Sequence, residues 1–172
     1  MQVIYLNYLR DASILGVVVA RSSLLRELDS ASREYLASYV LFNQAVAGHV
    51  GIHPTDLQCL NLLSADPRPR TTGEIAELTG LTSGSATRLV DRLEGAGYVT
   101  RQRDESDKRQ VKVRLRTEGL HRLRDVWDRL RTGWDTMFED YTEMELELLV
   151  RHMRRTSELG RQQRARLNRG DL

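Results

Sequence analysis

The chain has 172 residues, of which 40% are hydrophobic, 29% are charged and 6% are aromatic, and its net charge is +2. This composition indicates a folded, helix-rich protein, and it argues against a disordered chain or a protein that binds single strands by base stacking. The one cysteine, Cys59, excludes a disulfide framework within one chain and fits a reducing cytoplasm, where we expect the protein.

Residues 1–23 precede the first clear amphipathic pattern. Their longest apolar run, residues 14–20, is too short to span a bilayer, so we expect no membrane partner. Arg10 lies beside Asp11, which argues against the positive start of a signal peptide. We interpret residues 1–23 as an extension, either a non-native segment from a misassigned start codon or a frayed helical arm.

Two helices are predicted next. Residues 23–50 carry apolar side chains at helical spacing, which indicates one long helix. Pro54 suits the first turn of a second helix over residues 54–64, and Pro67 and Pro69 forbid its continuation.

A helix-turn-helix follows. Thr71 and Glu74 have the spacing of a capping box, and Gly80 stands where the helix needs a left-handed residue to end. Only two residues then precede a fourth helix over residues 83–94. Its apolar stripe faces the core and consists of Ala86, Leu89, Val90 and Leu93. A turn this short between two amphipathic helices is typical of a helix-turn-helix.

Residues 98–103 and 110–116 predict a hairpin whose tip is the charged segment 104–109. In the second strand, apolar side chains alternate with basic ones, which indicates one buried and one wet face. The apolar set is Val111, Val113 and Leu115, and the basic set is Lys112, Arg114 and Arg116. We interpret this hairpin as a wing.

Two helices complete the chain. Thr117 begins the fifth, whose Trp127 and Trp134 are expected in core or dimer packing, with a ligand-lining role as the alternative. Thr142 and Glu145 form a second capping-box pattern that opens the last helix.

Basic residues concentrate around the wing. Residues 88–116 hold nine basic and five acidic residues, a net charge of +4, whereas the rest of the chain sums to −2. This asymmetry is expected of a surface that binds a polyanion, and a solvated basic face is the alternative.

Three linked motifs carry a family resemblance. They are GEIAELTGLT at residues 73–82, VDRLEGAGYV at 90–99, and RDESDKR at 103–109 followed by LRTEG at 115–119. With these spacings, residues 24–160 resemble the MarR family of transcription regulators.

The resemblance implies a mainly α fold with a small β wing. A winged helix-turn-helix over residues 54–116 would bind DNA, and residues 24–50 and 117–172 would form a helical dimerisation region. The expected function is that of a homodimeric repressor on pseudo-palindromic double-stranded DNA, released by a small aromatic or anionic effector.

The first half of the fourth helix is expected in the major groove. We predict DNA contacts from Ser83, Ser85, Thr87 and Arg88, and from Arg92 one turn further along. Arg88 is a candidate for a guanine contact, with a phosphate contact as the alternative. Asp91 is interpreted as structural.

The resemblance implies that the wing places Arg109 in the minor groove and that Asp107 orients it. Arg103 and Lys108 are predicted phosphate contacts, whereas Lys112 and Arg114 could equally face solvent. The alternative for the whole wing is a solvated tip.

No nucleophile–base pair, metal-ligand spacing or phosphate-binding loop is present in the sequence, so we expect no enzyme, cofactor or metal. Cys59 is expected to be a buried hydrophobe, and Gly51 and Pro54 break any helix that would place His49 and His53 on one face as metal ligands. The alternative function is a degenerate winged-helix adaptor that binds proteins and not DNA.

Overall fold

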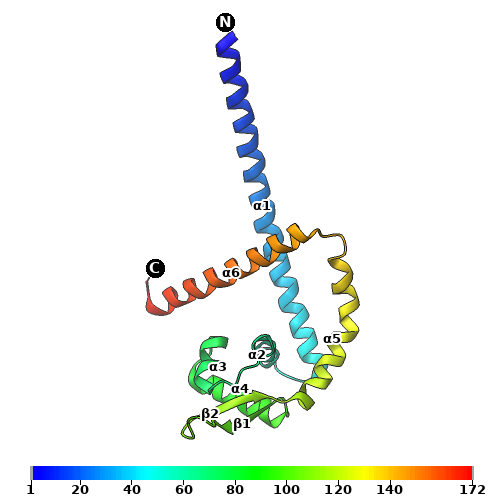
Figure 1. Cartoon of the computed structure of the whole chain (residues 1–172), viewed down its shortest axis with the longest axis vertical. Helices are drawn as coiled ribbons and strands as arrows, with labels where there is room; N and C mark the ends of the chain where they lie inside the picture. The colour runs from blue at the N-terminus through cyan, green and yellow to red at the C-terminus, as the bar shows by residue number, and fades with distance from the viewer. Residues whose placement is uncertain (1, 172) are drawn as a thin grey trace. The chain divides into compact units, whose positions relative to one another are not determined.

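The computed structural model describes the backbone of residues 2–171 and the side chains of residues 21–171 except 122 and 132. Within this range the elements follow in the order α1 (Gln2–Val50), α2 (Pro54–Ala65), α3 (Thr72–Thr79), α4 (Ser83–Gly95), β1 (Val99–Arg103), β2 (Val111–Leu115), α5 (Thr117–Met137) and α6 (Glu143–Arg169), as Figure 1 shows. Residues 1–124 and 125–172 form two compact units, and α5 begins in the first unit and ends in the second. The predicted fold class, mainly α with a small β wing, is confirmed.

Helix α1 is longer than the sequence pattern predicts: it begins at Gln2, whereas the pattern predicts a start at residue 23. The side chains of residues 1–20 lie outside the described residues, so the interpretation of residues 1–23 as an extension stays a prediction. The helix ends as Gly51 takes a φ of 73° and the Ile52 amide donates to the Ala47 carbonyl at 3.0 Å. This left-handed residue turns the chain into α2, whose first turn holds Pro54 as predicted.

The predicted helix-turn-helix is present. The capping box closes in both directions, because the Glu74 amide donates to Thr71 Oγ1 at 3.2 Å and the Thr71 amide donates to Glu74 Oε2 at 2.7 Å. Gly80 ends α3 with a φ of 76°. Thr82 then caps α4 by accepting a hydrogen bond from the Ser85 amide. Local capping chemistry therefore sets both ends of the turn.

The core beneath α4 consists of apolar side chains at the predicted spacing. Each member of the predicted stripe is buried, together with side chains of α2 and α3; the set is Ala86, Leu89, Val90, Leu93, Leu57, Leu60 and Ile75. Full burial of one leucine side chain contributes about 1.5–3 kcal/mol, so this stripe fixes which face of α4 points outward.

The wing is an antiparallel hairpin whose register pairs Val99 with Leu115 and Arg103 with Val111. The segment before α3 adds a bridge to its outer edge, because the Arg70 amide donates to the Val113 carbonyl at 3.1 Å and the Val113 amide donates to the Arg70 carbonyl at 2.7 Å. Val113 is buried as predicted. Val111 is not, since its side chain lies near the tip, beyond the core, and is 47% exposed.

The second predicted capping box also forms. The Thr142 amide donates to Glu145 Oε2 at 2.8 Å, and the Glu145 amide donates back to Thr142 Oγ1 at 3.4 Å. Among the helices that the structure describes, none combines the length and apolarity needed to cross a bilayer.

Candidate nucleic-acid interface

The first turns of α4 present small hydroxyl side chains and one arginine. Ser83, Thr87 and Arg88 are exposed, whereas Ser85 is half-buried. The Thr87 hydroxyl donates to the Ser83 carbonyl at 3.0 Å, and Thr82 Oγ1 donates to Ser85 Oγ at 3.0 Å. These hydroxyls therefore hold the helix start, and Arg88 is the long side chain that projects from this surface.

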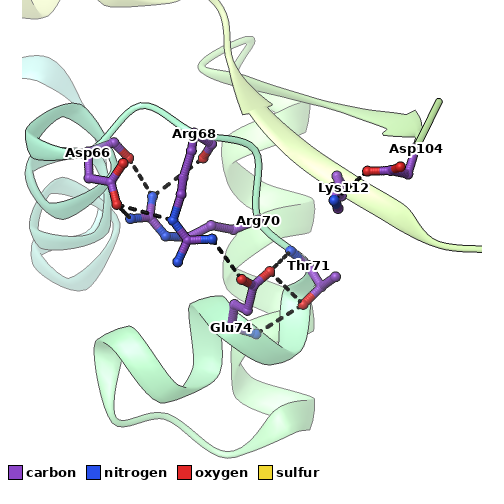
Figure 2. Close-up of polar contacts among 7 residues, drawn as sticks. All are labelled: Asp66, Arg68, Arg70, Thr71, Glu74, Asp104 and Lys112. Atoms are coloured by element: carbon purple, nitrogen blue, oxygen red, sulfur yellow. Dashed lines mark hydrogen bonds and ion pairs between the residues drawn. The ribbon is translucent and has the colours of Figure 1, made fainter. Parts of the chain in front are cut away.

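Asp104 organises the tip of the wing. Its Oδ1 accepts from the amides of Ser106 at 2.8 Å and Asp107 at 3.0 Å and from the Ser106 hydroxyl. Its Oδ2 contacts Lys112 Nζ across the hairpin, as Figure 2 shows. The hydrogen bond from Lys112, then those from Ser106 and the amides, hold the pKa of Asp104 well below its ordinary value. The sequence pattern predicts only a charged tip, whereas in the structure the Asp104 side chain shapes it.

Asp107 binds the backbone next to Arg109. Its Oδ1 accepts from the Arg109 amide at 3.1 Å and its Oδ2 accepts from Gln110 Nε2 at 3.2 Å. The carboxylate therefore fixes the backbone from which Arg109 projects. Asp107 therefore contacts the main chain of Arg109 and not its guanidinium, so it orients the side chain through the backbone.

Basic side chains of α4 and the wing fall into two groups. Arg88, Arg103, Lys108 and Arg109 are exposed, and their side chains make no ion pair or hydrogen bond within the part of the chain that the structure describes. Arg114 is likewise exposed, and its side chain makes no ion pair or hydrogen bond with the described residues. In contrast, Arg92, Arg101 and Lys112 are bound by acidic side chains; their partners are Asp56, Asp91 with Glu94, and Asp104.

Arg92 is the predicted DNA contact whose side chain is already occupied. It donates from Nε to Oδ2 of Asp56 at 2.9 Å and from Nη2 to Oδ1 at 2.5 Å. The Asp56 side chain is only 4% exposed, whereas that of Arg92 is 49% exposed. This hydrogen-bonded carboxylate raises the pKa of Arg92.

Arg101 joins the wing to α4. Its Nη2 donates to Asp91 at 2.7 Å, its Nη1 donates to Glu94, and its amide donates to Glu94 Oε1 at 2.8 Å. The backbone hydrogen bond and then the guanidinium lower the pKa of Glu94. The structural role predicted for Asp91 is confirmed by this pair.

Charged side chains also stiffen the segment that leads into α3 (Figure 2). Arg70 is buried and donates to the Asp66 carbonyl at 2.5 Å and to Asp66 Oδ2 at 2.6 Å, while Arg68 reaches Glu74 Oε1 at 2.9 Å. This network is not predicted by the sequence pattern. Its one visible sign is an Asp-Pro-Arg-Pro-Arg run, which places two arginines within reach of one carboxylate.

Other reactive groups belong to α2 and its N-cap. Cys59 is fully buried as predicted, and burial, then the nearby Asp56, raise the pKa of its thiol to about 11. The His53 ring caps α2 by accepting from the Thr55 amide at 3.3 Å. No group of His, Cys, Asp and Glu suited to a metal ion occurs among the described residues.

Comparison with known proteins decides the family. The MarR-family profile matches residues 50–110, the segment that holds the helix-turn-helix and most of the wing. The chain is also 36% identical over 148 residues to YcgE of Bacillus subtilis (strain 168), named an uncharacterized HTH-type transcriptional regulator; the match covers 86% of this chain and 96% of YcgE. This chain belongs to the MarR family.

Two further comparisons agree. The HTH-type transcriptional repressor YetL of Bacillus subtilis (strain 168) is 30% identical over 78 residues, which cover 45% of this chain and 47% of YetL. A MarR-family structure from Bacillus stearothermophilus superposes with a TM-score of 0.61 and 25% identity, over 80% of this chain and 95% of that one. The protein is thus a DNA-binding, winged helix-turn-helix transcription regulator of the MarR family.

Proposed function

We propose that this MarR-family regulator is a homodimeric repressor that binds pseudo-palindromic double-stranded DNA. The observation that carries the proposal is the set of exposed basic side chains without acidic partners on α4 and the wing, within the described residues. In this proposal, Ser83, Ser85, Thr87 and Arg88 contact the major groove. The wing contributes Arg103, Asp107, Lys108 and Arg109, with Arg109 in the minor groove.

Exposed apolar side chains support the homodimer. Along α1, Leu24 is 64% exposed, Leu36 is 59% exposed and Leu41 is 65% exposed. On α6, Met144 is 77% exposed and Leu148 is 52% exposed. Burial of such side chains against a second copy would remove them from water, and twofold symmetry would place two copies of α4 about 34 Å apart, one turn of DNA.

Separate observations support the repressor role and the effector. A relative named a repressor, YetL, supports the first. An open, shallow surface of α6 supports the second, because it places apolar Leu146 and Val150 beside three arginines and one acid; the charged residues are Arg151, Arg154, Arg155 and Glu147. Such a lining suits a small aromatic or anionic effector. Any effector would release DNA only to the extent that it binds the DNA-free state more tightly.

Fluorescence anisotropy with a duplex from the region upstream of the protein's own gene tests the proposal. The expected result is tight binding that weakens steeply between about 50 and 200 mM salt and exceeds the binding of a scrambled duplex. A protein that binds neither duplex at either salt concentration would contradict the proposal and favour the adaptor function. Sedimentation of the free protein then measures whether it is a dimer.

A further inference from the structure

The buried carboxylate of Asp56 is the starting point. It lies in the first turn of α2, and Arg92 of α4 follows it by 36 residues. Both Asp56 oxygens accept from the Arg92 fork, at 2.9 and 2.5 Å. A carboxylate removed from water is costly unless it is paired and hydrogen-bonded, so Asp56 needs this arginine in the folded protein.

Arg101 makes a matching link on the wing side. Its side chain is 26% exposed and binds Asp91 and Glu94, the two acidic residues of the last turns of α4. The last three charged residues of this helix therefore form ion pairs with neighbouring elements: Arg92 with α2, and Asp91 and Glu94 with β1. The DNA-facing first turns of α4 lack any such ion pair among the described residues.

Electrostatic competition decides what Arg92 does when DNA is bound. To move onto a phosphate, its guanidinium would have to leave Asp56 as a buried charge without a partner. That loss exceeds the gain from one solvent-exposed phosphate contact, because an exposed ion pair contributes little whereas breaking a buried one is strongly unfavourable. Arg92 is therefore expected to stay on Asp56.

We propose that Arg92 and Arg101 are positioning residues: they anchor the second half of α4 to α2 and to the wing, so that Arg88 and Arg109 approach DNA in a fixed arrangement. Neither would bind phosphate. The inference rests on the proposed DNA interface and reassigns Arg92, which the sequence pattern alone marks as a contact.

The salt dependence of DNA binding separates positioning from contact. Each phosphate contact contributes about one unit to the slope of log K against log salt. Arg92→Gln is therefore expected to weaken binding about tenfold or more with an unchanged slope. The matched control is Arg109→Gln, whose slope is expected to fall by about one unit per wing. A fall of that size for Arg92→Gln would overturn the proposal.

Asp56→Asn gives a result of opposite sign under the two explanations. If Arg92 were a phosphate contact, loss of the Asp56 charge would free the guanidinium and strengthen DNA binding. If Arg92 positions the helix, Asp56→Asn weakens binding to a similar extent as Arg92→Gln, and the double variant is no weaker than either single one. Additive losses, or a gain from Asp56→Asn, would contradict the positioning role.

Two additions keep the test decisive if a variant unfolds. Arg92→Lys keeps the charge but loses the bidentate fork, so we expect it to remain weak, whereas a phosphate contact would be largely retained. Arg101→Gln tests the second link, whose acidic partners Asp91 and Glu94 are more exposed than Asp56. Thermal melting of Asp56→Asn, Arg92→Gln and their double variant measures the coupling without DNA. A wild-type protein that fails to bind DNA while this coupling is present would refute the proposed interface and not the ion pair.

Discussion

The first turn of α5 lies directly against the turn that follows α4: a Cβ placed on Gly119 would be 2.1 Å from the carbonyl oxygen of Gly97. Beside this contact, the Arg116 amide donates to the Tyr98 carbonyl at 2.9 Å. Because backbone meets backbone here, any side chain at position 119 must displace α5 from the base of the wing.

Gly119→Ala should therefore destabilise the protein by about 1–3 kcal/mol, the usual cost of overpacking. Gly133→Ala on the same helix is the control, since a Cβ there meets no atom within 4 Å of the described structure. Alanine is a better helix former than glycine, so the control should stabilise by up to about 1 kcal/mol. Chemical denaturation of both variants checks this; equal effects at the two positions would show that the close approach at Gly119 is unimportant.

Asp104→Asn should loosen the tip of the wing while leaving the core intact. The substitution removes the charge that binds Lys112 and weakens the acceptor of the Ser106 and Asp107 amides. Hydrogen exchange at these two amides should become faster, and DNA affinity should fall. Glu105→Gln, at an exposed neighbouring position, is the control. Unchanged exchange in Asp104→Asn would mean that the turn holds without its carboxylate.

The same carboxylate predicts a pH dependence. The pKa of Asp104 is depressed in the folded protein from its ordinary value of 3.8, so its contribution to stability is present above pH 3.8 and is lost as the pH falls through the folded value. The melting temperatures of wild type and Asp104→Asn should differ at neutral pH and converge below pH 3.8. A difference that grows on acidification would have the wrong sign.

Cys59 should resist alkylation in the folded protein. With its pKa raised to about 11, only about one thiol in a thousand is ionised at pH 8, and the side chain is fully buried. Iodoacetamide followed by mass spectrometry should label it only after denaturation. Rapid labelling of the native protein would indicate that α2 opens far more easily than its packing suggests.

Arg88→Ala should relax base preference at one position of each half-site. A bidentate arginine–guanine pair discriminates by about 1–3 kcal/mol, whereas a phosphate contact carries no sequence information. In vitro selection with the purified variant should return the wild-type logo except at that symmetric position. An identical logo, together with a smaller salt slope, would reassign Arg88 to the phosphate backbone.

The helix-turn-helix could be predicted from the sequence because its determinants are local. The reciprocal hydrogen bonds of Thr71 and Glu74 need only a spacing of three residues, and Gly80 ends α3 by its own conformation. The wing follows from the alternation of apolar and basic residues around Val113. Such short-range patterns leave few alternative folds.

The ion pairs of the site could not be predicted in this way. Asp56 and Arg92 meet only after α2 and α4 have packed together, and Arg101 reaches Asp91 and Glu94 only once β1 lies beside α4. Before the fold is known, Arg92 is indistinguishable from Arg88 as a cation on the recognition helix. Tertiary contact separates the two, because it gives Arg92 a buried acidic partner and leaves Arg88 exposed.

The salt dependence of binding to the upstream duplex, measured for wild type and Arg109→Ala side by side, tests the central claim most directly. If the wing binds DNA through Arg109, the variant should bind all duplexes more weakly, and its slope should be smaller by about one unit for each wing in contact. An unchanged affinity and an unchanged slope would remove Arg109 and the wing tip from the interface.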